Sequence, residues 1–171
     1  MKKPSAGVLA KVAILITLAV VLTRVLTLVN SPYLKVGLGF LPVALCGMLY
    51  GPVYGMICGA ISDVIGTILF PTGDFFIGFT ITAALTGLFF GLFLGAEKIG
   101  WKRVACVIVT NCLILSLGAN TMMISYWYGV SMKALFVTRL PQAVITSVAY
   151  AVFLPLLGRL LIPALKKQNL A

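Results

Sequence analysis

Three ionisable residues, Arg24, Asp63 and Arg139, lie inside hydrophobic runs of this sequence that are long enough to cross a membrane. Counting back from the expected outer helix ends at ~1.5 Å per residue places Arg24 and Arg139 about 8 Å, and Asp63 about 10 Å, below one membrane surface. An uncompensated charge at that depth costs at least ~2.5–3.5 kcal/mol, so each side chain is expected to face the bundle interior, a partner or a polar ligand. The alternative is a structural Arg–Asp pair together with one arginine that reaches the interface.

The same outer layer is expected to contain further polar and aromatic side chains, an arrangement that would suit a flat polar ligand. The segment Tyr126-Trp127-Tyr128 could instead be an aromatic belt, because Tyr and Trp are common at membrane interfaces. The position of this segment beside Asn120 and Arg139 favours a role in ligand binding as much as a role as an aromatic belt. The candidate ligand-binding residues are Arg24, Lys35, Asp63, Phe75, Phe79, Thr80, Asn120, Tyr126, Trp127, Arg139 and Gln142.

No catalytic, metal or cofactor site is expected. The three acidic residues, Asp63, Asp74 and Glu97, are predicted in a helix, an outer loop and an inner loop, too far apart for paired-carboxylate catalysis. The chain has no histidine, and its four cysteines lie in apolar stretches without a CxxC pair, which favours buried thiols over a disulfide framework or zinc site. The segment 95–100 resembles a phosphate loop, but Trp101 stands where that motif requires lysine.

The composition indicates one integral membrane domain spanning residues 1–171. Of the 171 residues, 61% are hydrophobic and only 9% are charged, and the mean hydropathy is +1.15. Soluble proteins carry about 25% charged residues, so lipid must cover this surface in place of water. The net charge of +10 comes from short clusters between apolar runs, which makes nucleic-acid binding improbable.

Apolar runs separated by Gly, Pro or charge predict an all-α bundle of six transmembrane helices. The second run is short for a span and contains Gly37, Gly39 and Pro42, so a kinked or broken helix is expected there. The first run is interpreted as a retained helix rather than a signal peptide, since it is long and contains Arg24. The expected helices cover residues 7–29, 34–50, 53–70, 75–94, 104–124 and 134–157.

The basic residues predict the orientation of this bundle. Nine of the thirteen fall on one side, which is therefore expected to be cytoplasmic and to carry both termini. The other four, at the outer helix ends, are Arg24, Lys35, Lys133 and Arg139. The nine are Lys2, Lys3, Lys11, Lys98, Lys102, Arg103, Arg159, Lys166 and Lys167.

Small residues recur every four positions on the third and fourth expected helices. This spacing places them on one helix face and allows two helices to approach closely. Such faces would hold Asp63 and the Phe75–Thr80 segment in fixed places. The residues are Gly51, Gly55 and Gly59 on one helix, and Ala83, Gly87, Gly91 and Gly95 on the other.

Several short segments together resemble one known family. The sequence is similar, over essentially its whole length, to the folate-specific substrate-binding (S) components of energy-coupling factor (ECF) transporters. The GxGFLP segment followed by the D…FPTG segment is typical of the folate-specific members. The matching segments are Val36-Gly37-Leu38-Gly39-Phe40-Leu41-Pro42-Val43-Ala44, Gly51-Pro52-Val53-Tyr54-Gly55, Ser62-Asp63 and Phe70-Pro71-Thr72-Gly73.

The resemblance implies a non-enzymatic vitamin carrier in a prokaryotic plasma membrane. Such a component binds folate from outside and works with a transmembrane coupling subunit and two cytoplasmic ATPases. The family docks this subunit through an AxxxA motif on the first helix. Ala6 and Ala10 fit that motif literally, whereas the register counted back from Arg24 favours Ala13 and Thr17.

Folate chemistry agrees with the expected outer layer. Asp63 or Asn120 could accept hydrogen bonds from the pterin edge, and basic residues could pair with the two carboxylates of the glutamate tail. One alternative is an S component for another vitamin, such as thiamine or riboflavin, although cationic thiamine would favour more acidic residues. The other alternative is a structural membrane subunit without a ligand, in which Arg24 and Asp63 only clamp two helices together.

Overall fold

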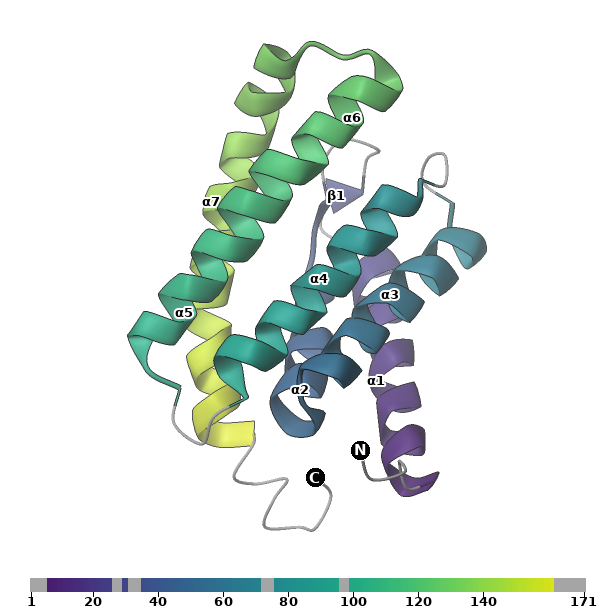
Figure 1. Cartoon of the computed structure of the whole chain (residues 1–171), viewed down its shortest axis with the longest axis vertical. Coiled ribbons are helices and arrows are strands. Elements are labelled where there is room, and N and C mark those ends of the chain that lie inside the picture. The colour runs from purple at the N-terminus through teal and green to yellow at the C-terminus, as the bar shows by residue number, and fades with distance from the viewer. Residues whose placement is uncertain (1–5, 26–28, 31–34, 72–75, 96–98, 162–171) are drawn as a thin grey trace.

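The computed structural model describes residues 6–25, 29–30, 35–71, 76–95 and 99–161, and it forms a bundle of helices (Figure 1). Five of the described helices are long and apolar enough to cross a membrane, and a shorter apolar helix lies among them. The prediction of an all-α bundle of six membrane helices is confirmed. The elements are α1 (Ala6–Arg24), β1 (Val29–Asn30), β2 (Lys35–Val36), α2 (Phe40–Tyr50), α3 (Pro52–Leu69), α4 (Ile77–Leu94), α5 (Trp101–Ile108), η1 (Val109–Asn120), α6 (Thr121–Tyr128), α7 (Met132–Leu156) and η2 (Leu157–Leu161).

The connection between the first two helices differs from the prediction. Helix α1 ends at Arg24 rather than at residue 29, and α2 begins at Phe40 rather than at residue 34. Between them, β1 and β2 pair antiparallel, with Val29 opposite Val36. The chain then returns against α1 at Gly39, where an added Cβ would overlap the Thr23 side chain. The hydropathy of this segment is high, but its glycines favour a close backbone approach over a continuous helix.

The fifth span is longer than predicted and changes its winding along its length. Helix α5, the π-helical segment η1 and α6 form one continuous rod from Trp101 to Tyr128 rather than from 104 to 124. This rod runs antiparallel to α7, and the two elements lie side by side (Figure 1). Helix α7 in turn continues into η2. The rod and α7 together form one side of the bundle (Figure 1).

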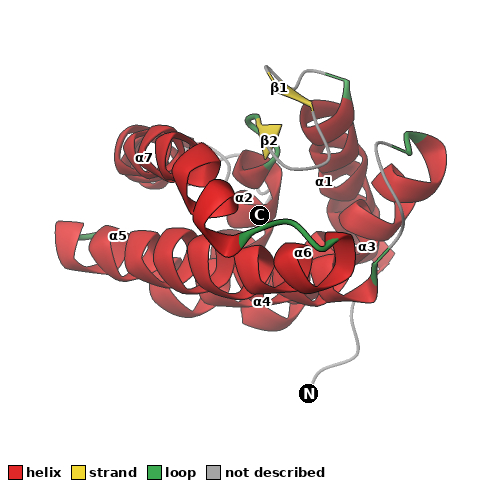
Figure 2. Cartoon of the chain, turned by 90° about the horizontal axis from the view of Figure 1, so that it is seen from above, coloured by secondary structure: helices red, strands yellow, loops and turns green. Residues whose placement is uncertain are grey.

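Glycine residues hold α2, α3 and α4 in close contact. A Cβ added at Gly87 of α4 would overlap the Gly55 carbonyl of α3, and one added at Gly91 would overlap Pro52. Gly51, with a φ of +94°, lets the chain reverse between α2 and α3. The close approach expected from the four-residue spacing is therefore confirmed. Seen from above, α2 lies between α7 and α1, with α4 along its side (Figure 2).

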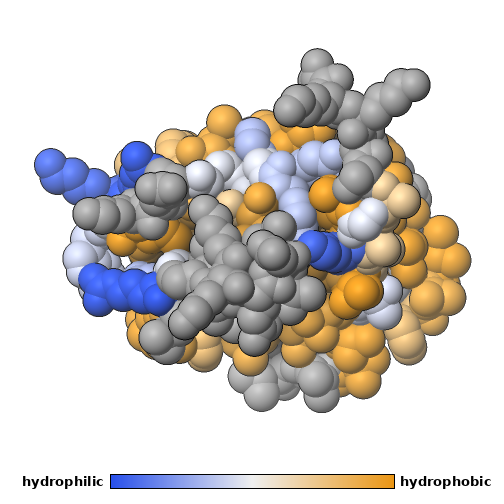
Figure 3. Space-filling view, turned by 90° about the horizontal axis from the view of Figure 1, so that it is seen from below, coloured by the Kyte–Doolittle hydropathy of each residue, from blue (hydrophilic) through white to orange (hydrophobic). Residues whose placement is uncertain are grey.

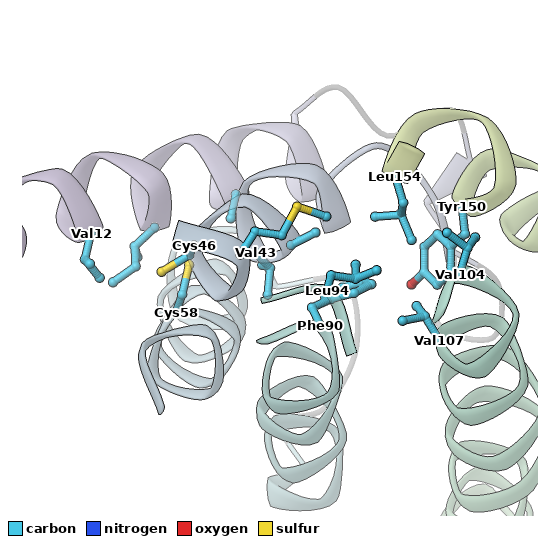
Figure 4. Packing of buried hydrophobic residues seen from close by; sticks show 14 of the residues in the cluster. Val12, Val43, Cys46, Cys58, Phe90, Leu94, Val104, Val107, Tyr150 and Leu154 are labelled. Carbon is cyan, nitrogen blue, oxygen red and sulfur yellow. The ribbon is translucent and has the colours of Figure 1, made fainter. Parts of the chain in front are cut away.

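The hydrophobic core lies in the half of the bundle where α1 begins and α4 ends. Phe90 and Leu94 are fully buried there and belong to a cluster with buried side chains from six other helical elements (Figure 4). Three of the cysteines are buried as expected, but Cys106 is exposed on α5, which corrects the expectation that all four are buried. All four are free thiols, and no group of metal-binding side chains occurs among the residues that are described.

Basic side chains gather at the end of the bundle where α1 begins. Lys102, Arg103 and Arg159 are exposed at this end, and Lys11 of α1 is half-buried. Viewed from below, strongly hydrophilic side chains lie at this end and hydrophobic ones dominate the flanks (Figure 3). Helix α1 begins and η2 ends at the same end, as an even number of spans requires (Figure 1). This charge distribution agrees with the predicted cytoplasmic side.

The contact between α3 and α4 predicts a sharp difference between two glycine substitutions. Gly87→Ala should lower the free energy of unfolding by about 1–3 kcal/mol, because the added methyl group overlaps backbone rather than a movable side chain. Gly100→Ala is the matched control, since a Cβ there meets no atom within 4 Å and φ is −88°. Thermal unfolding in detergent measures both. Equal stability of the two variants would show that this contact does not constrain the fold.

Candidate ligand-binding site

Arg24 and Asp63 meet at the centre of a polar network that joins three helices. The Arg24 side chain is only 3% exposed, and its Nη2 lies 3.5 Å from Asp63 Oδ1. The same Nη2 donates to Thr67 Oγ1 at 2.7 Å, and Thr80 Oγ1 donates to Asp63 Oδ2 at 2.9 Å. Gly66 makes room for the guanidinium group, because a Cβ there would lie 2.8 Å from Arg24 Nε. The network therefore ties α1 and α4 to α3.

A separate cavity of about 200 Å³ lies between α4, η1 and α7. Its lining also includes the loop before α2, the first residue of α2 and one residue of α1. Polar side chains and aromatic rings both face this space. The lining residues are Thr23, Gly37, Gly39, Phe40, Thr86, Asn111, Cys112, Leu115, Ser116, Asn120, Gln142, Thr146 and Tyr150.

Aromatic rings form the inner end of this cavity. Tyr150, 6% exposed, packs with its ring centroid 4.6 Å from that of Phe40 and 5.5 Å from that of Phe90. Tyr150 belongs both to the cavity lining and to the hydrophobic core. The solid core of the bundle therefore closes the cavity on the side where α7 approaches its C-terminal end.

Asn111 is the most unusual polar residue of the cavity. Its side chain is 4% exposed, and neither Oδ1 nor Nδ2 has a hydrogen-bond partner among the described residues. Burying an amide without partners costs about 1–3 kcal/mol by mutational measurements. A polar group retained at such a cost, and lining a cavity, indicates that its partner is a ligand.

Three further hydrogen bonds shape the outer part of the cavity. Arg139 is 7% exposed, and its Nη1 donates to the Ser116 carbonyl at 3.2 Å, so a buried positive charge lies beside the cavity wall. The Thr82 hydroxyl donates to Asn120 Oδ1 at 2.9 Å and so fixes the Asn120 amide. Thr121 Oγ1 also donates to the Ser116 carbonyl, at 3.2 Å.

Comparison with known proteins agrees with this architecture. The family model of the ECF transporter, substrate-specific component, matches residues 8–160 of the chain. The chain belongs to this family. Its members are transporter components and not enzymes, which agrees with the expectation that the chain has no catalytic function.

Individual relatives of this S component are folate transporters. The folate transporter FolT of Clostridium novyi (strain NT) is 37% identical over 146 residues, which are 85% of this chain and 84% of that protein. FolT of Streptococcus mutans serotype c is 27% identical over 134 residues, or 75% of this chain and 72% of that protein. A crystal structure of FolT bound with folic acid has a TM-score of 0.84 at 30% identity, covering 90% of this chain and 93% of that chain.

The predicted site residues of this S component lie in three separate places. Asn120 and Gln142 line the cavity, and Arg139 lies beside it. Arg24, Asp63 and Thr80 form the network described above and are not among the residues that line this cavity. The depth argument grouped Arg24, Asp63 and Arg139. The structure brings Arg24 and Asp63 together, whereas Arg139 binds the Ser116 carbonyl instead.

Aromatic candidates occupy the outer end of α4 and α6. Phe76, which the sequence did not single out, lies 5.6 Å from Phe79 and 4.7 Å from Trp127 between ring centroids. Tyr126 is 89% exposed, as an interfacial anchor would be. Phe75 lies outside the described residues, as does the side chain of Lys35, whose backbone forms part of β2.

Sequence reasoning missed most of the cavity lining. Thr23, Phe40, Thr146 and Tyr150 lie within hydrophobic runs where a single Thr or aromatic residue carries no signal. Asn111 did carry one, because an amide inside a predicted membrane helix is costly. Its distance of nine residues from Asn120 concealed the relation, since that spacing reverses the face of an α-helix.

The Arg24 network predicts a specific pattern of stability. Asp63→Ala leaves the buried guanidinium without its carboxylate and should cost about 3–5 kcal/mol of unfolding free energy. Replacing both residues with leucine should recover much of that loss, because no buried charge then remains. Denaturation of the three proteins in detergent measures the difference. A double variant as unstable as Asp63→Ala would contradict the clamp.

Proposed function

We propose that this chain is the folate-binding S component of an ECF transporter, with the cavity between η1 and α7 as its folate site. The observation that carries this proposal is the buried, unpartnered amide of Asn111 facing a cavity with an aromatic inner end. The similarity to FolT proteins, one of them bound with folic acid, supports folate as the ligand.

The antiparallel pairing of η1 and α7 orders the cavity from inside to outside. Asn111 and Tyr150 lie at its inner end, and Asn120 lies at the outer end, with Arg139 joined to Ser116 nearby. A flat pterin ring suits the aromatic and amide end, whereas carboxylates suit the end beside a buried arginine. We therefore infer that folate binds with its pterin inward and its glutamate tail outward.

The size of the cavity supports this arrangement. At about 200 Å³ it is smaller than the ~300–1,000 Å³ of sites that enclose a drug-sized ligand. It suits the bicyclic ring rather than the whole vitamin, so the benzoyl-glutamate part is expected to extend toward the outer surface. The aromatic residues Phe79, Tyr126 and Trp127 and the basic residue Lys35 remain candidates for that outer part.

The alternatives fit less well. Thiamine is a cation, yet the cavity has a buried arginine, Arg139, beside it. Asp63, the one acid among the described residues, binds Arg24 and Thr80. A structural subunit without a ligand would gain stability from an apolar residue in place of Asn111. In our proposal Arg24, Asp63 and Thr80 support the site by fixing α4, whose Thr86 lines the cavity.

The exposed small residues of α1 support the proposal that this chain binds a coupling subunit. The four small residues predicted for docking, Ala6, Ala10, Ala13 and Thr17, are all exposed. Thr17 Oγ1 donates to the Ala13 carbonyl at 3.0 Å, so its hydroxyl does not obstruct an approaching apolar helix. We propose that this face contacts a transmembrane coupling subunit, which joins the single domain 1–171 to two cytoplasmic ATPases in a prokaryotic plasma membrane.

Ligand selectivity tests the proposed function. Isothermal titration of the detergent-purified chain should show binding of folate and no measurable binding of thiamine. Pteroate keeps a benzoate carboxylate but lacks both carboxylates of the glutamate tail, so it should bind more weakly than folate if the tail lies at the Arg139 end. Binding of thiamine or riboflavin in preference to folate would assign a different vitamin. Binding of none of them would leave the structural subunit.

The same titration assigns the orientation of the ligand. Arg139→Gln should weaken folate binding by about 10-fold or more, since a hydrogen bond to a charged group contributes about 1.5–3 kcal/mol. It should change pteroate binding much less. Lys102→Gln is the matched control, because it removes an exposed charge at the opposite end of the bundle. An equal loss for both ligands would mean that Arg139 does not act on the tail.

The proposed docking face predicts variants that impair assembly with the coupling subunit but leave folate binding intact. Ala13→Trp and Thr17→Trp should reduce recovery of the coupling subunit in a pull-down, because a bulky side chain prevents close helix approach. Folate affinity of the isolated chain should stay within about twofold of the unchanged protein. Val144→Trp, at a 62% exposed position on α7, controls for a tryptophan that faces lipid. If both α1 variants assemble normally, the docking face lies elsewhere, with Ala6 and Ala10 next to be tested.

A further inference from the structure

The winding of η1 decides which side chains face the cavity. From Val109 to Asn120 the rod forms a π-helix, whose hydrogen bonds join residues five apart instead of four. Such segments are rare and occur often at functional sites. Here the π-helical segment contributes five of the residues that line the cavity, namely Asn111, Cys112, Leu115, Ser116 and Asn120.

The two asparagines illustrate the effect of this winding. They are nine residues apart, which is 2.5 turns of an α-helix at 3.6 residues per turn and would place them on opposite faces. In a π-helix, with just over four residues per turn, nine residues make about two full turns. Asn111 and Asn120 therefore face the same cavity, one turn on either side of Leu115 and Ser116.

The hydrogen bonds leave complementary groups toward the cavity. Asn111 is 4% exposed and keeps both a donor and an acceptor without partners in the described part of the chain. Asn120 is held by Thr82 through its Oδ1, which leaves its amide hydrogens for another acceptor. Tyr150 and Phe40 lie in the same lining and provide aromatic surface beside the amides.

We propose that the π-helical winding of η1 presents Asn111 and Asn120 as a carboxamide pair that recognises the hydrogen-bonding edge of a flat heterocycle. Asn111 is the specificity-determining residue, because a carboxamide matches an adjacent ring N–H and C=O with two parallel hydrogen bonds. The pyrimidinone edge of a pterin carries this pair of groups. Asn120 donates to a second ring acceptor. This inference rests on the proposed folate function and assigns the reading of the ring to two named residues.

Stability and binding should respond in opposite directions. Asn111→Leu keeps the branched shape of the side chain but has no hydrogen-bonding group, and the added methyl volume can enter the cavity. The ligand-free protein should therefore unfold at the same or a higher temperature than the unchanged chain. Folate affinity should fall by about 10-fold or more. Asn120→Leu should also weaken folate binding, because both amides face the ligand. Thr110→Val is the matched control, since the Thr110 hydroxyl donates to the Cys106 carbonyl one turn earlier in the same rod.

The experiment combines titration with folate and thermal unfolding without ligand for these four proteins. Asn111→Leu with unchanged affinity, or with a ligand-free unfolding temperature well below that of Thr110→Val, overturns the role of Asn111. An effect of Asn111→Leu without any effect of Asn120→Leu overturns the pair. Failure of the unchanged chain to bind folate refutes the proposed function instead, and with it the pterin as the recognised ring.

Discussion

Lipid around the bundle forces every buried polar group to find its partner within the protein or in a ligand. Outside the helical backbone, this chain has few polar side chains, and most of those described in its interior belong to two places. One is the Arg24 network, in which guanidinium, carboxylate and hydroxyl groups bind one another. The other is the cavity between η1 and α7, in which Asn111 keeps its donor and acceptor for something else. The first satisfies the constraint internally, and the second leaves it for a ligand to satisfy.

The remainder of the fold keeps these two places apart and rigid. Close glycine contacts between α3 and α4, at Gly55 and Gly87, leave no freedom for sliding. The Arg24 network then fixes the outer end of α1 against the same pair. The hydrophobic core around Phe90 fills the other half of the bundle and closes the cavity at Tyr150. A site with a defined shape follows from this packing, because most of its walls are helices.

The sequence predicted what depends on energetic cost and left unpredicted what depends on geometry. Six apolar runs, the close glycine faces and the meeting of Arg24 with Asp63 all follow from the cost of exposing polar groups to lipid. The β-hairpin before α2 did not follow, because Val29 and Val36 are as apolar as helix residues. The cavity lining also did not follow, because α-helical periodicity places Asn111 and Asn120 on opposite faces. Only the π-helical winding of η1 brings them together.

An experimental structure of the purified chain saturated with folate tests the central claim most directly. The account predicts the pterin ring between η1 and α7, against Tyr150 and within hydrogen-bond distance of Asn111, with the glutamate tail directed toward Arg139. The Arg24 network should remain as it is, with Asp63 bound to Arg24 and Thr80. Folate bound elsewhere, for example on the Arg24 network with Asn111 still unpartnered, would contradict the account.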